Sequence, residues 1–331
     1  MQFDGTLLLR RSNVEDLLSL HDCIAAVDEI FRLQGEGRIP APGILGVRAP
    51  AGGLHVKAGL LPGDRNYLVA KLNANFPDNN AHFGLPTIQG MIVVFDAENG
   101  APLAILDSVD ITIKRTAAAS AVAAKHLARK ESSVATICGC GQQGRAQLRA
   151  VLLILPLTKI YAFDVDEHAA INYRNELSPE LRIDIELVHD LPKAIQKSDV
   201  CITCTTANKS FVCKEDVSPG TFIAAVGADN EDKQEIDSAL IASAKVVADS
   251  LEQSCAIGDT HHAIADGLMR KKDVYAELCE IVAGRKVGRA SDDEIIVFDS
   301  TGVAIEDAVA AAAVYERALA NGVGTDFDFS A

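Results

Sequence analysis

The fold of this 331-residue chain is decided by the stretch VATICGCGQQG, residues 134–144. Val134–Cys138 is apolar and predicts a buried strand, and the glycines after it have the spacing GxGxxG. A helix is predicted from Gln142 to Leu153, and the next strand, Lys159–Phe163, is followed at once by an acidic residue. This order of strand, glycine loop, helix and acidic strand end is typical of a dinucleotide-binding unit.

Each residue type in the loop suits a nucleotide diphosphate. Gly139 permits the tight turn, Gly141 lets the backbone approach the diphosphate, and Gly144 allows the helix to pack closely on the sheet. The loop residues Gln142 and Gln143 open the helix, whose free amide groups and dipole favour an anion. Asp164 is placed to bind the ribose hydroxyls of the adenosine.

The residues around Asp164 predict NAD (NADH) as the cofactor, with NADP less favoured. A carboxylate at this position repels a 2′-phosphate, and the next residue, Val165, cannot neutralise one. Arg145 and Arg174 are the two cations that would reverse this preference if they folded over the site.

The second half of the chain alternates strands with helices, which predicts an α/β fold with a Rossmann-type doubly wound parallel sheet. The remaining predicted helices are Glu167–Leu177 and Leu191–Gln196. The remaining strands are predicted at Ile183–Leu187, Val200–Thr203, Thr221–Ala225, Lys245–Ala248 and Ile295–Phe298.

The first half predicts a different, α+β domain. A capping-box pattern at Ser12–Glu15 predicts one helix running to about Gly35, and an Ala-rich helix is expected from Ile113 to Ala128. Between them lie closely spaced strands without helices, which favours an antiparallel or mixed sheet. These strands are Ile44–Arg48, Leu54–Ala58, Tyr67–Asn73, Ile88–Phe95 and Leu103–Leu106.

These patterns divide the chain into three parts. Residues 1–125 are expected to form a separate first domain, and residues 126–299 to form the NAD-binding domain. Residues 300–331, with a helix over about Ala304–Ala320, are expected to return to the first domain.

Composition narrows the class of protein further. The formal net charge of −15 argues against a nucleic-acid partner, which needs a basic face. No apolar run has the roughly 18 residues that a membrane span needs, and the N-terminus lacks the pattern of a secretory signal. The eight cysteines do not form a small-domain disulfide framework, and Cys201 and Cys204 are read as part of a buried strand. We expect a cytoplasmic protein without a membrane partner and without a metal site.

Polar side chains interrupt the apolar strands of the first half. A buried cation such as Lys71 needs a protein partner or a ligand carboxylate. Each residue alone is compatible with an edge strand facing water, but several together favour a carboxylate-binding site. They are Arg48, His55, Lys57, Lys71, Asn73 and Asn75.

Motifs along nearly the whole chain resemble the ornithine cyclodeaminase/μ-crystallin family. The most specific is KRTAAAS, residues 114–120, which matches the family's RTAA(A)S signature. Further matches are KLNANFP at 71–77, LPTI at 85–88, VGAD at 226–229 with KQEID at 233–237, and STGVAIED at 300–307.

The resemblance implies a role for each matching position. Arg48, Lys71 and Arg115 would hold the substrate carboxylate, and Asp229, together with Lys71, would be catalytic. Asp229 would act as the acid or base near the reacting nitrogen, although a loop-capping aspartate is also plausible there. Contacts to the cofactor would come from Thr87, Thr116, Thr205, Val226, Thr301 and Gly302.

One segment departs from the family pattern. His55 and Lys57 stand where many relatives have an apolar stretch ending in Met-Pro-Ala. If Lys57 points inward, it adds a cation that disfavours a free δ-ammonium and favours a smaller or cyclic imino acid. His55 would then be a further substrate-binding or acid–base group. The alternative, a Lys57 that faces solvent, is equally compatible with the sequence.

The resemblance implies a nicotinamide-dependent enzyme acting at the Cα–N bond of a small amino or imino acid, assembled as a homodimer through the first domain's sheet. Ornithine cyclodeamination to proline ranks first. Reduction of a cyclic ketimine such as Δ1-pyrroline-2-carboxylate and alanine dehydrogenation are the alternatives. A μ-crystallin-like binding protein without catalysis is the non-enzyme alternative, and a zinc hydrolase using His261 and His262 is the weakest hypothesis.

Overall fold

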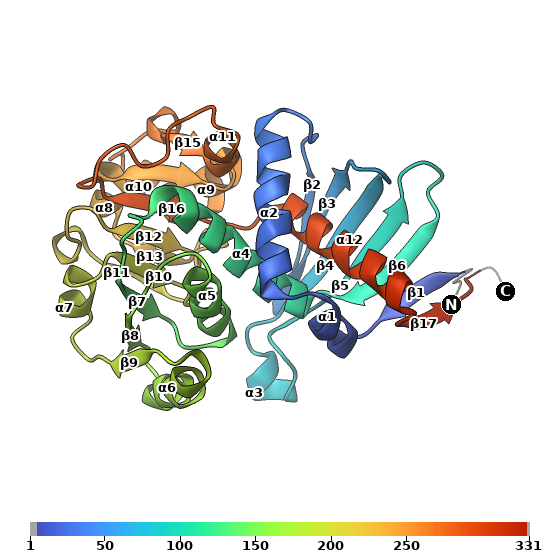
Figure 1. Ribbon diagram of the computed structural model, residues 1–331, viewed down its shortest axis with the longest axis horizontal. Coiled ribbons are helices and arrows are strands. Elements are labelled where there is room, and N and C mark those ends of the chain that lie inside the picture. Colours follow the sequence, from blue (N-terminus) through green and yellow to red (C-terminus); the bar gives the residue numbers. More distant parts are fainter. Residues whose placement is uncertain (1–4, 330–331) are drawn as a thin grey trace. The chain divides into compact units, whose positions relative to one another are not determined.

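The computed structural model describes residues 5–329 and separates into two compact units (Figure 1). Unit 1 comprises the chain up to Arg115 and from Val303 onward, and unit 2 comprises Thr116–Gly302. The first division lies inside helix α4 (Val109–Leu127), ahead of the 125/126 boundary expected from sequence. The C-terminal helix α12 (Ala304–Asn321) belongs to unit 1.

Unit 2 is built on an 8-stranded sheet with the order β15-β14-β16-β12-β10-β7-β8-β9, in which every neighbouring pair is parallel. Strand order reverses around the first strand, β7, as in a doubly wound fold. The strands are β7 (Val134–Cys138), β8 (Lys159–Phe163), β9 (Asp184–Leu187), β10 (Val200–Thr203), β12 (Phe222–Ala225), β14 (Lys245–Ala248), β15 (Ala276–Glu277) and β16 (Ile296–Asp299).

Apolar sequence explains these strands, because a parallel sheet covered on both faces buries every side chain. Strands β10, β12 and β16 are buried along their whole length. Side chains cap most of the helices between them, as Asp166 caps α6 and Asp190 caps α7. The helices are α5 (Gln142–Leu152), α6 (Glu167–Leu181), α7 (Leu191–Gln196), α8 (Ser238–Ser243), α9 (Leu251–Ile257), α10 (Asp259–Ala265) and α11 (Leu278–Val282).

Unit 1 contains a 7-stranded mixed sheet, as the sequence indicates, with the order β17-β1-β6-β5-β4-β3-β2. Strands β2 to β6 are antiparallel neighbours, and β1 runs parallel to β6. The strands are β1 (Thr6–Leu9), β2 (Gly43–Ala49), β3 (Gly52–Leu61), β4 (Tyr67–Asn75), β5 (Ile88–Asp96), β6 (Pro102–Asp107) and β17 (Thr325–Phe327).

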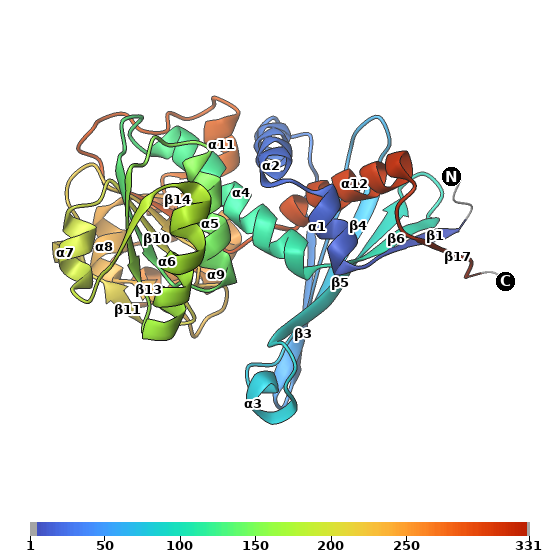
Figure 2. The same ribbon diagram turned by 60° about the horizontal axis from the view of Figure 1, so that its bottom comes forward.

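Helix α12 lies along one face of this sheet, against β3 and β4, and α1 (Arg11–Leu17) and α2 (Leu20–Gly35) pack on it (Figure 2). The side chains beneath α12, including Tyr67, Val69 and Ile92, are buried. The C-terminal helix thus packs on the unit 1 sheet and closes its core.

The other face of the same sheet, which we call the outer face, remains apolar and exposed. The register places Leu45, Val56, Leu72 and Met91 in one row across β2 to β5. Leu45 is 58% exposed and Met91 48%. A face of this kind needs cover from another surface.

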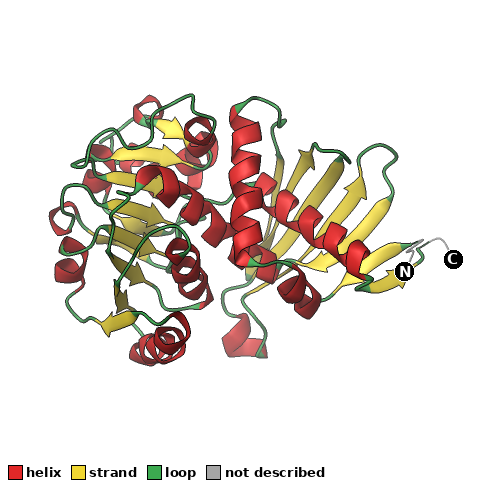
Figure 3. Cartoon of the chain, in the orientation of Figure 1, coloured by secondary structure: helices red, strands yellow, loops and turns green. Residues whose placement is uncertain are grey.

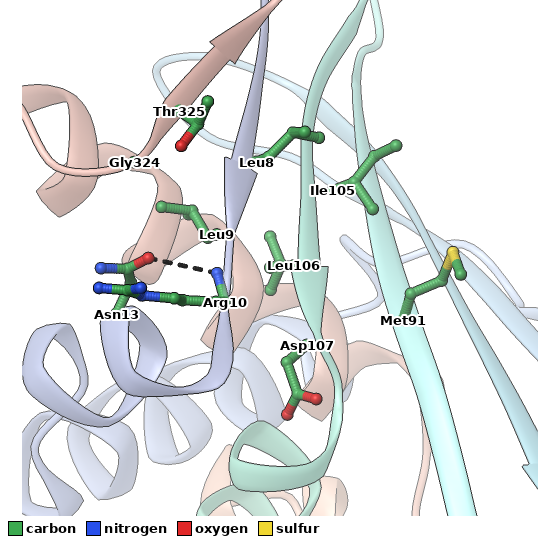
Figure 4. A pocket seen from close by; sticks show the side chains of 10 residues that line it. All are labelled: Leu8, Leu9, Arg10, Asn13, Met91, Ile105, Leu106, Asp107, Gly324 and Thr325. Carbon is green, nitrogen blue, oxygen red and sulfur yellow. Dashed lines mark hydrogen bonds between the residues drawn. The ribbon is translucent and has the colours of Figure 1, made fainter.

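A pocket of about 640 Å³ opens at the edge of the unit 1 sheet (Figure 4). Within residues 5–329, none of the site residues predicted above lines it. Its lining consists of Leu8, Leu9, Arg10, Asn13, Met91, Ile105, Leu106, Asp107, Gly324 and Thr325.

The prediction of one N-terminal helix capped at Ser12 is wrong. The first helix begins at Arg11, where Asn13 Oδ1 accepts a hydrogen bond from the Arg10 amide at 3.2 Å. Leu18 is extended and fully buried, and it separates α1 from α2. The Ser19 hydroxyl then caps α2 by accepting from the Asp22 amide at 3.1 Å.

Several elements carry no local signal in the sequence. Strands β1 and β17 pair with each other from opposite ends of the chain, so neither forms without the tertiary fold. Helix α3 (Asn79–Phe83) lies between two strands that were expected to follow each other without a helix (Figure 3). Also missed are the short strands β11 (Asn208–Val212) and β13 (Gln234–Ile236) and helices α8 to α11.

Two further observations concern membrane spans and disulfide bonds. Among residues 5–329, no helix combines the length and apolar character needed to cross a membrane. All eight cysteines are free thiols, and Cys201 lies buried within strand β10.

Candidate functional site

The glycine loop lies between β7 and α5, at the carboxyl end of the strand around which the sheet order reverses. Gly139 has a φ of 103°, and a Cβ there would lie 2.8 Å from the Cys204 carbonyl oxygen. A Cβ on Gly144 would lie 1.9 Å from the Gly139 oxygen, so these two glycines are required by the fold itself. A Cβ on Gly141 meets no atom within 4 Å.

Packing within the chain therefore does not require a glycine at position 141. It is the N-cap residue of α5, and no side chain caps that helix end. Gln142 and Gln143 form its first turn. An exposed helix N-terminus beside a glycine loop favours an anionic ligand such as a diphosphate.

Asp164 follows β8 beside this loop. Its Oδ2 accepts a hydrogen bond from the Cys140 amide at 2.7 Å, and its Oδ1 accepts one from the Asp166 amide at 2.9 Å. The remaining lone pairs of the carboxylate can accept bonds from ribose hydroxyls. Arg145 pairs with Glu176 at 2.8 Å, stacks over the Tyr173 ring and donates to the Cys140 carbonyl, so its guanidinium is already engaged within the protein.

Thr205 and Val226 follow the neighbouring strands β10 and β12, and a buried carboxylate, Glu235, connects the two loops. Its oxygens accept hydrogen bonds from the Thr205 amide at 2.6 Å and from the Gly227 amide at 2.7 Å. They also accept from the hydroxyls of Thr203 and Thr205, both at 2.7 Å. Burial raises the pKa of Glu235, and these donors oppose the rise.

Asp229 lies three residues beyond Val226 at the same edge of the sheet. It is exposed, and its Oδ1 pairs with the Lys233 ammonium at 2.7 Å. Because Asp229 is exposed and its lysine partner has a flexible side chain, the carboxylate could turn toward the nitrogen of a bound substrate. Its catalytic role stays a prediction.

Thr301 and Gly302 follow β16 and are fixed by the buried Asp249. The Thr301 hydroxyl donates to Asp249 Oδ1 at 3.0 Å, and the Gly302 amide donates to Oδ2 at 2.5 Å. The carboxyl ends of five parallel strands thus carry all but one of the predicted cofactor-binding residues of unit 2. In an open parallel sheet this edge is where ligands bind.

The two other predicted cofactor contacts lie elsewhere. Thr116 is buried in α4, next to the division between the units. Thr87 is exposed in unit 1 just before β5, and its carbonyl accepts a hydrogen bond from the Phe76 amide at 2.9 Å. Their cofactor roles stay predictions.

Unit 1 contains a buried group of charges that joins α12 to the sheet and to α4. Asp307 contacts Lys71 Nζ at 2.6 Å and Arg115 Nε at 2.9 Å, and Glu306 contacts Arg115 Nη1 at 2.8 Å. All four side chains are almost fully buried. Sequence reasoning left open a protein partner or a ligand carboxylate for Lys71, and the structure supplies the protein partner.

The charges within this group shift each other's pKa values. Burial lowers the pKa of Lys71 to about 8; Asp307 opposes this effect, whereas Arg115 and Lys57 add to it. Burial alone would raise the pKa of Asp307, but Arg115 and Lys71 lower it. The two cations and the two carboxylates of the group thus stabilise each other's charged forms.

The other predicted substrate residues lie on the same face of the sheet. Lys57 is the direct partner of Lys71 across the β3–β4 pair, and His55 is the partner of Asn73. Cross-strand partners point to one face, so Lys57 is turned toward the α12 side. Arg48 shares this face at the far end of β2, where it is exposed, as is His55.

Four carboxylates that organise these groups were not assigned roles from sequence: Glu235, Asp249, Glu306 and Asp307. Three of them stand within the quoted motifs. A signal was available, since acidic residues in apolar surroundings need several donors or a cation. Their partners come from distant segments, so those partners could not be named.

His261 and His262 take part in local contacts. A ring nitrogen of His262 lies 2.8 Å from the Lys233 oxygen, and one of His261 lies 3.3 Å from the Cys255 oxygen. No group of three or more metal-binding side chains was found within residues 5–329.

A doubly wound sheet with this glycine loop and acidic strand end defines unit 2 as a Rossmann-type dinucleotide-binding domain. The model of the ornithine cyclodeaminase/mu-crystallin family matches residues 5–322. The chain belongs to that family.

Known relatives cover almost the full chain. Alanine dehydrogenase of Archaeoglobus fulgidus is 37% identical over 98% of both chains. An archaeal alanine dehydrogenase dimer with bound NAD superposes with a TM-score of 0.94, 38% identity and coverage of 98% and 99%. Δ1-pyrroline-2-carboxylate reductase of Thermococcus litoralis, in complex with NADH and L-proline, superposes with a TM-score of 0.92 and 37% identity. That match covers 97% of this chain and 100% of the reductase chain. Relatives thus include an amino acid dehydrogenase and an imine reductase.

Two glycines of the loop provide a matched pair of variants. Gly144→Ala is expected to destabilise unit 2 by about 3 kcal/mol, because the new methyl group overlaps the Gly139 carbonyl. Gly141→Ala introduces the same methyl group into open space, so the melting temperature should stay near that of the wild type. Thermal unfolding of both variants without cofactor measures the difference; equal melting temperatures would contradict the packing role of Gly144.

Proposed function

We propose that the protein is an NAD-dependent oxidoreductase that acts at the Cα–N bond of a small amino or imino acid. The observation that supports this most is the buried group Lys71–Asp307–Arg115 with Lys57 beside it. Such a group attracts a carboxylate and holds it at a fixed place. The relatives named alanine dehydrogenase and Δ1-pyrroline-2-carboxylate reductase act on α-amino and α-imino acids of this kind.

The residues of unit 2 fit NAD. Gly139, Gly141 and the first turn of α5 would hold the diphosphate, and Asp164 would hold the adenosine ribose. The open space at Gly141 leaves room for the diphosphate, and the engagement of Arg145 by Glu176 supports NAD over NADP. When bound, NAD accepts or donates the hydride.

The chain's own residues would supply the rest of the chemistry. Lys71 and Arg115 would orient the substrate by its α-carboxylate, which places Cα for hydride transfer. Removing a hydride from Cα leaves a positively charged iminium, and a nearby carboxylate such as Asp229 would stabilise it. The same carboxylate can take the amine proton beforehand or return it in the reverse direction.

Lys57 bears on which reaction the protein catalyses and on which substrates it accepts. Ornithine cyclodeamination ranks first from sequence, but it requires room for the substrate's free δ-ammonium. A lysine on the α12 side of the sheet, directly opposite Lys71, repels a second cation on the substrate. We therefore favour amino acid oxidation and imine reduction over cyclodeamination.

We also propose that the protein forms a homodimer through the outer face of the unit 1 sheet. Leu45, Val47, Leu54 and Met91 leave an exposed apolar surface there, and an identical face on a second copy would cover it. The archaeal alanine dehydrogenase related to this chain is a dimer.

The function is tested by binding and turnover with purified protein. NADH is expected to raise the melting temperature, and NADH formation from NAD⁺ should follow addition of one of alanine, proline, aspartate or glutamate. Asp229→Asn should lower kcat for that amino acid about 100-fold or more, because the amine proton loses its acceptor. The neighbouring Asp232→Asn serves as the control. Full turnover in Asp229→Asn would contradict its role, and ammonia release from ornithine without net NADH would indicate cyclodeamination.

The lowered pKa of Lys71 predicts a pH dependence of substrate binding. Below pH about 8 the ammonium is charged and binds the carboxylate; above it Lys71 deprotonates, so KM for the amino acid should rise. Asp307→Asn removes the carboxylate that favours the charged form, so the rise should begin at lower pH. Measuring KM from pH 6 to 10 for both proteins, with melting temperatures to verify folding, checks this. A variant profile that coincides with the wild type would contradict the coupling.

The proposed dimer is tested by molar mass. The wild type should elute at twice the 35.1 kDa of one chain. Leu45→Glu places a charge in the outer face and is expected to shift the mass toward the monomer. Leu268→Glu, at a residue of unit 2 with similar exposure, is the control and should leave the mass unchanged. A monomeric wild type, or a Leu45→Glu variant that stays dimeric, would contradict this interface.

A further inference from the structure

Three fully buried carboxylates lie close together in unit 2, those of Glu235, Asp259 and Asp299. Glu235 belongs to β13, Asp259 is the first residue of α10, and Asp299 is the last residue of β16. No lysine, arginine or histidine among residues 5–329 forms an ion pair with any of them. Three negative charges without a cation are costly in a protein interior, because burial removes the water that would stabilise them.

Main-chain amides connect the three residues. Asp259 Oδ1 accepts hydrogen bonds from the amides of Glu235 at 2.8 Å and Ile236 at 2.9 Å. Asp299 Oδ1 accepts one from the Asp259 amide at 3.3 Å. The Glu235 carboxylate in turn accepts from amides in the loops after β10 and β12. Asp259 therefore connects the end of β16 with the strand whose side chain fixes those two loops.

The three side chains differ in how many donors surround them. Glu235 accepts from two amides and two hydroxyls. Asp299 Oδ2 accepts from the hydroxyls of Ser254 at 2.5 Å and Thr260 at 2.6 Å, and from the Thr260 amide at 2.9 Å. Asp259 Oδ2 is buried and has no hydrogen-bond donor among residues 5–329. A buried oxygen without a donor costs most when it is charged, so a proton stabilises Asp259 more than either neighbour.

The electrostatic surroundings of Asp259 act in the same direction. Burial raises its pKa well above the usual range, and the charges of Asp299 and Glu235 raise the pKa further. The amides of Glu235 and Ile236 oppose this rise. Two carboxyl groups in different surroundings divide in this manner, with the better-solvated one charged and the other neutral.

The elements that pack against Asp259 direct no cation at it within residues 5–329. Helix α10 packs against α8, α9 and β13, and the sequence of α8, SALIAS, contains no titratable residue. Besides Asp259 and Asp299, the titratable groups on these elements, on β16 and on α10 itself are Glu235, Glu252, Cys255, His261 and His262. Glu252 pairs with Lys271, and both histidines contact backbone oxygens.

We propose that Asp259 carries a proton at neutral pH and, as an uncharged acid, is a positioning residue for the cofactor-binding loops. It holds the amides of β13, and β13 places Glu235 between the loops that carry Thr205 and Val226. This assignment rests on the proposed contacts of those two residues with NAD. Loss of the proton would add a third negative charge to the buried group and weaken its hold on both loops.

Melting temperatures of the protein without cofactor test for the proton. A carboxyl group whose pKa is raised by folding stabilises the protein at low pH, and this contribution is lost as the pH rises toward the folded value. Asp259→Asn replaces the neutral acid by a neutral amide of the same shape. Between pH 5 and 9 its melting temperature should therefore rise relative to that of the wild type. Asp266→Asn, at an exposed residue just beyond the end of the same helix, is the control and should follow the wild type.

Affinity for NADH tests the positioning role. Asp259→Ala removes the acceptor of two amides and should raise the Kd for NADH at pH 7 about 10-fold or more. Asp259→Asn keeps an acceptor oxygen, so its Kd should stay within about 2-fold of the wild type. A role that needed the negative charge would instead make both variants bind poorly. Asp259→Ser replaces Asp259→Ala if that variant does not fold.

The results separate this assignment from the cofactor contacts on which it rests. An Asp259→Asn variant that does not fold, or whose melting temperature runs parallel to that of the wild type from pH 5 to 9, would overturn the proton. An unchanged Kd in Asp259→Ala would overturn the positioning role, while the wild type still bound NADH. A wild type that does not bind NADH would overturn the cofactor contacts and this assignment together.

Discussion

The pairing of Asp307 with Lys71 and Arg115 is the interaction on which unit 1 depends. It joins the C-terminal helix to a central strand of the sheet and to helix α4, three segments that are far apart in the chain. Buried ion pairs gain little over apolar packing, but breaking one by removing a partner costs about 3–5 kcal/mol. The pairing therefore specifies how α12 returns to the sheet. It also places cations under the start of that helix, where the proposed substrate carboxylate would bind.

Unit 2 also contains buried carboxylates that connect distant segments, and there the connected segments are loops. Glu235 holds the loops after β10 and β12, and Asp249 holds the segment after β16. Each satisfies backbone amides that no strand partner reaches. Loops held in this manner do not need to be ordered when a ligand binds, which lowers the entropic cost of binding. The same carboxylates give the carboxyl edge of the sheet its shape before any cofactor is present.

Much of the fold could be read from local pattern, because strands such as β7 and helices such as α5 are specified by their own residues and neighbours. The first helix shows the limit. Its predicted cap at Ser12 fits the sequence pattern, but burial of Leu18 interrupts the helix and a second cap forms at Ser19. For the site, the lysine and arginine side chains were identified from sequence, whereas their partners at Glu306 and Asp307 were not. A charged residue can be recognised in the sequence, but the tertiary fold decides which residue of opposite charge pairs with it.

The sequence by itself determined the class of the second unit, the position of its glycine loop and the acidic residue at the end of the next strand. These features are short-range, because a tight turn between a strand and a helix constrains only the few residues that form it. Only the tertiary structure decided that Lys57 and Lys71 face the same side, since a side chain's face depends on the register between two strands. It also decided that Lys71 and Arg115 share the carboxylate of Asp307. That pairing is set by residues brought together from opposite ends of the chain, so no local pattern records it.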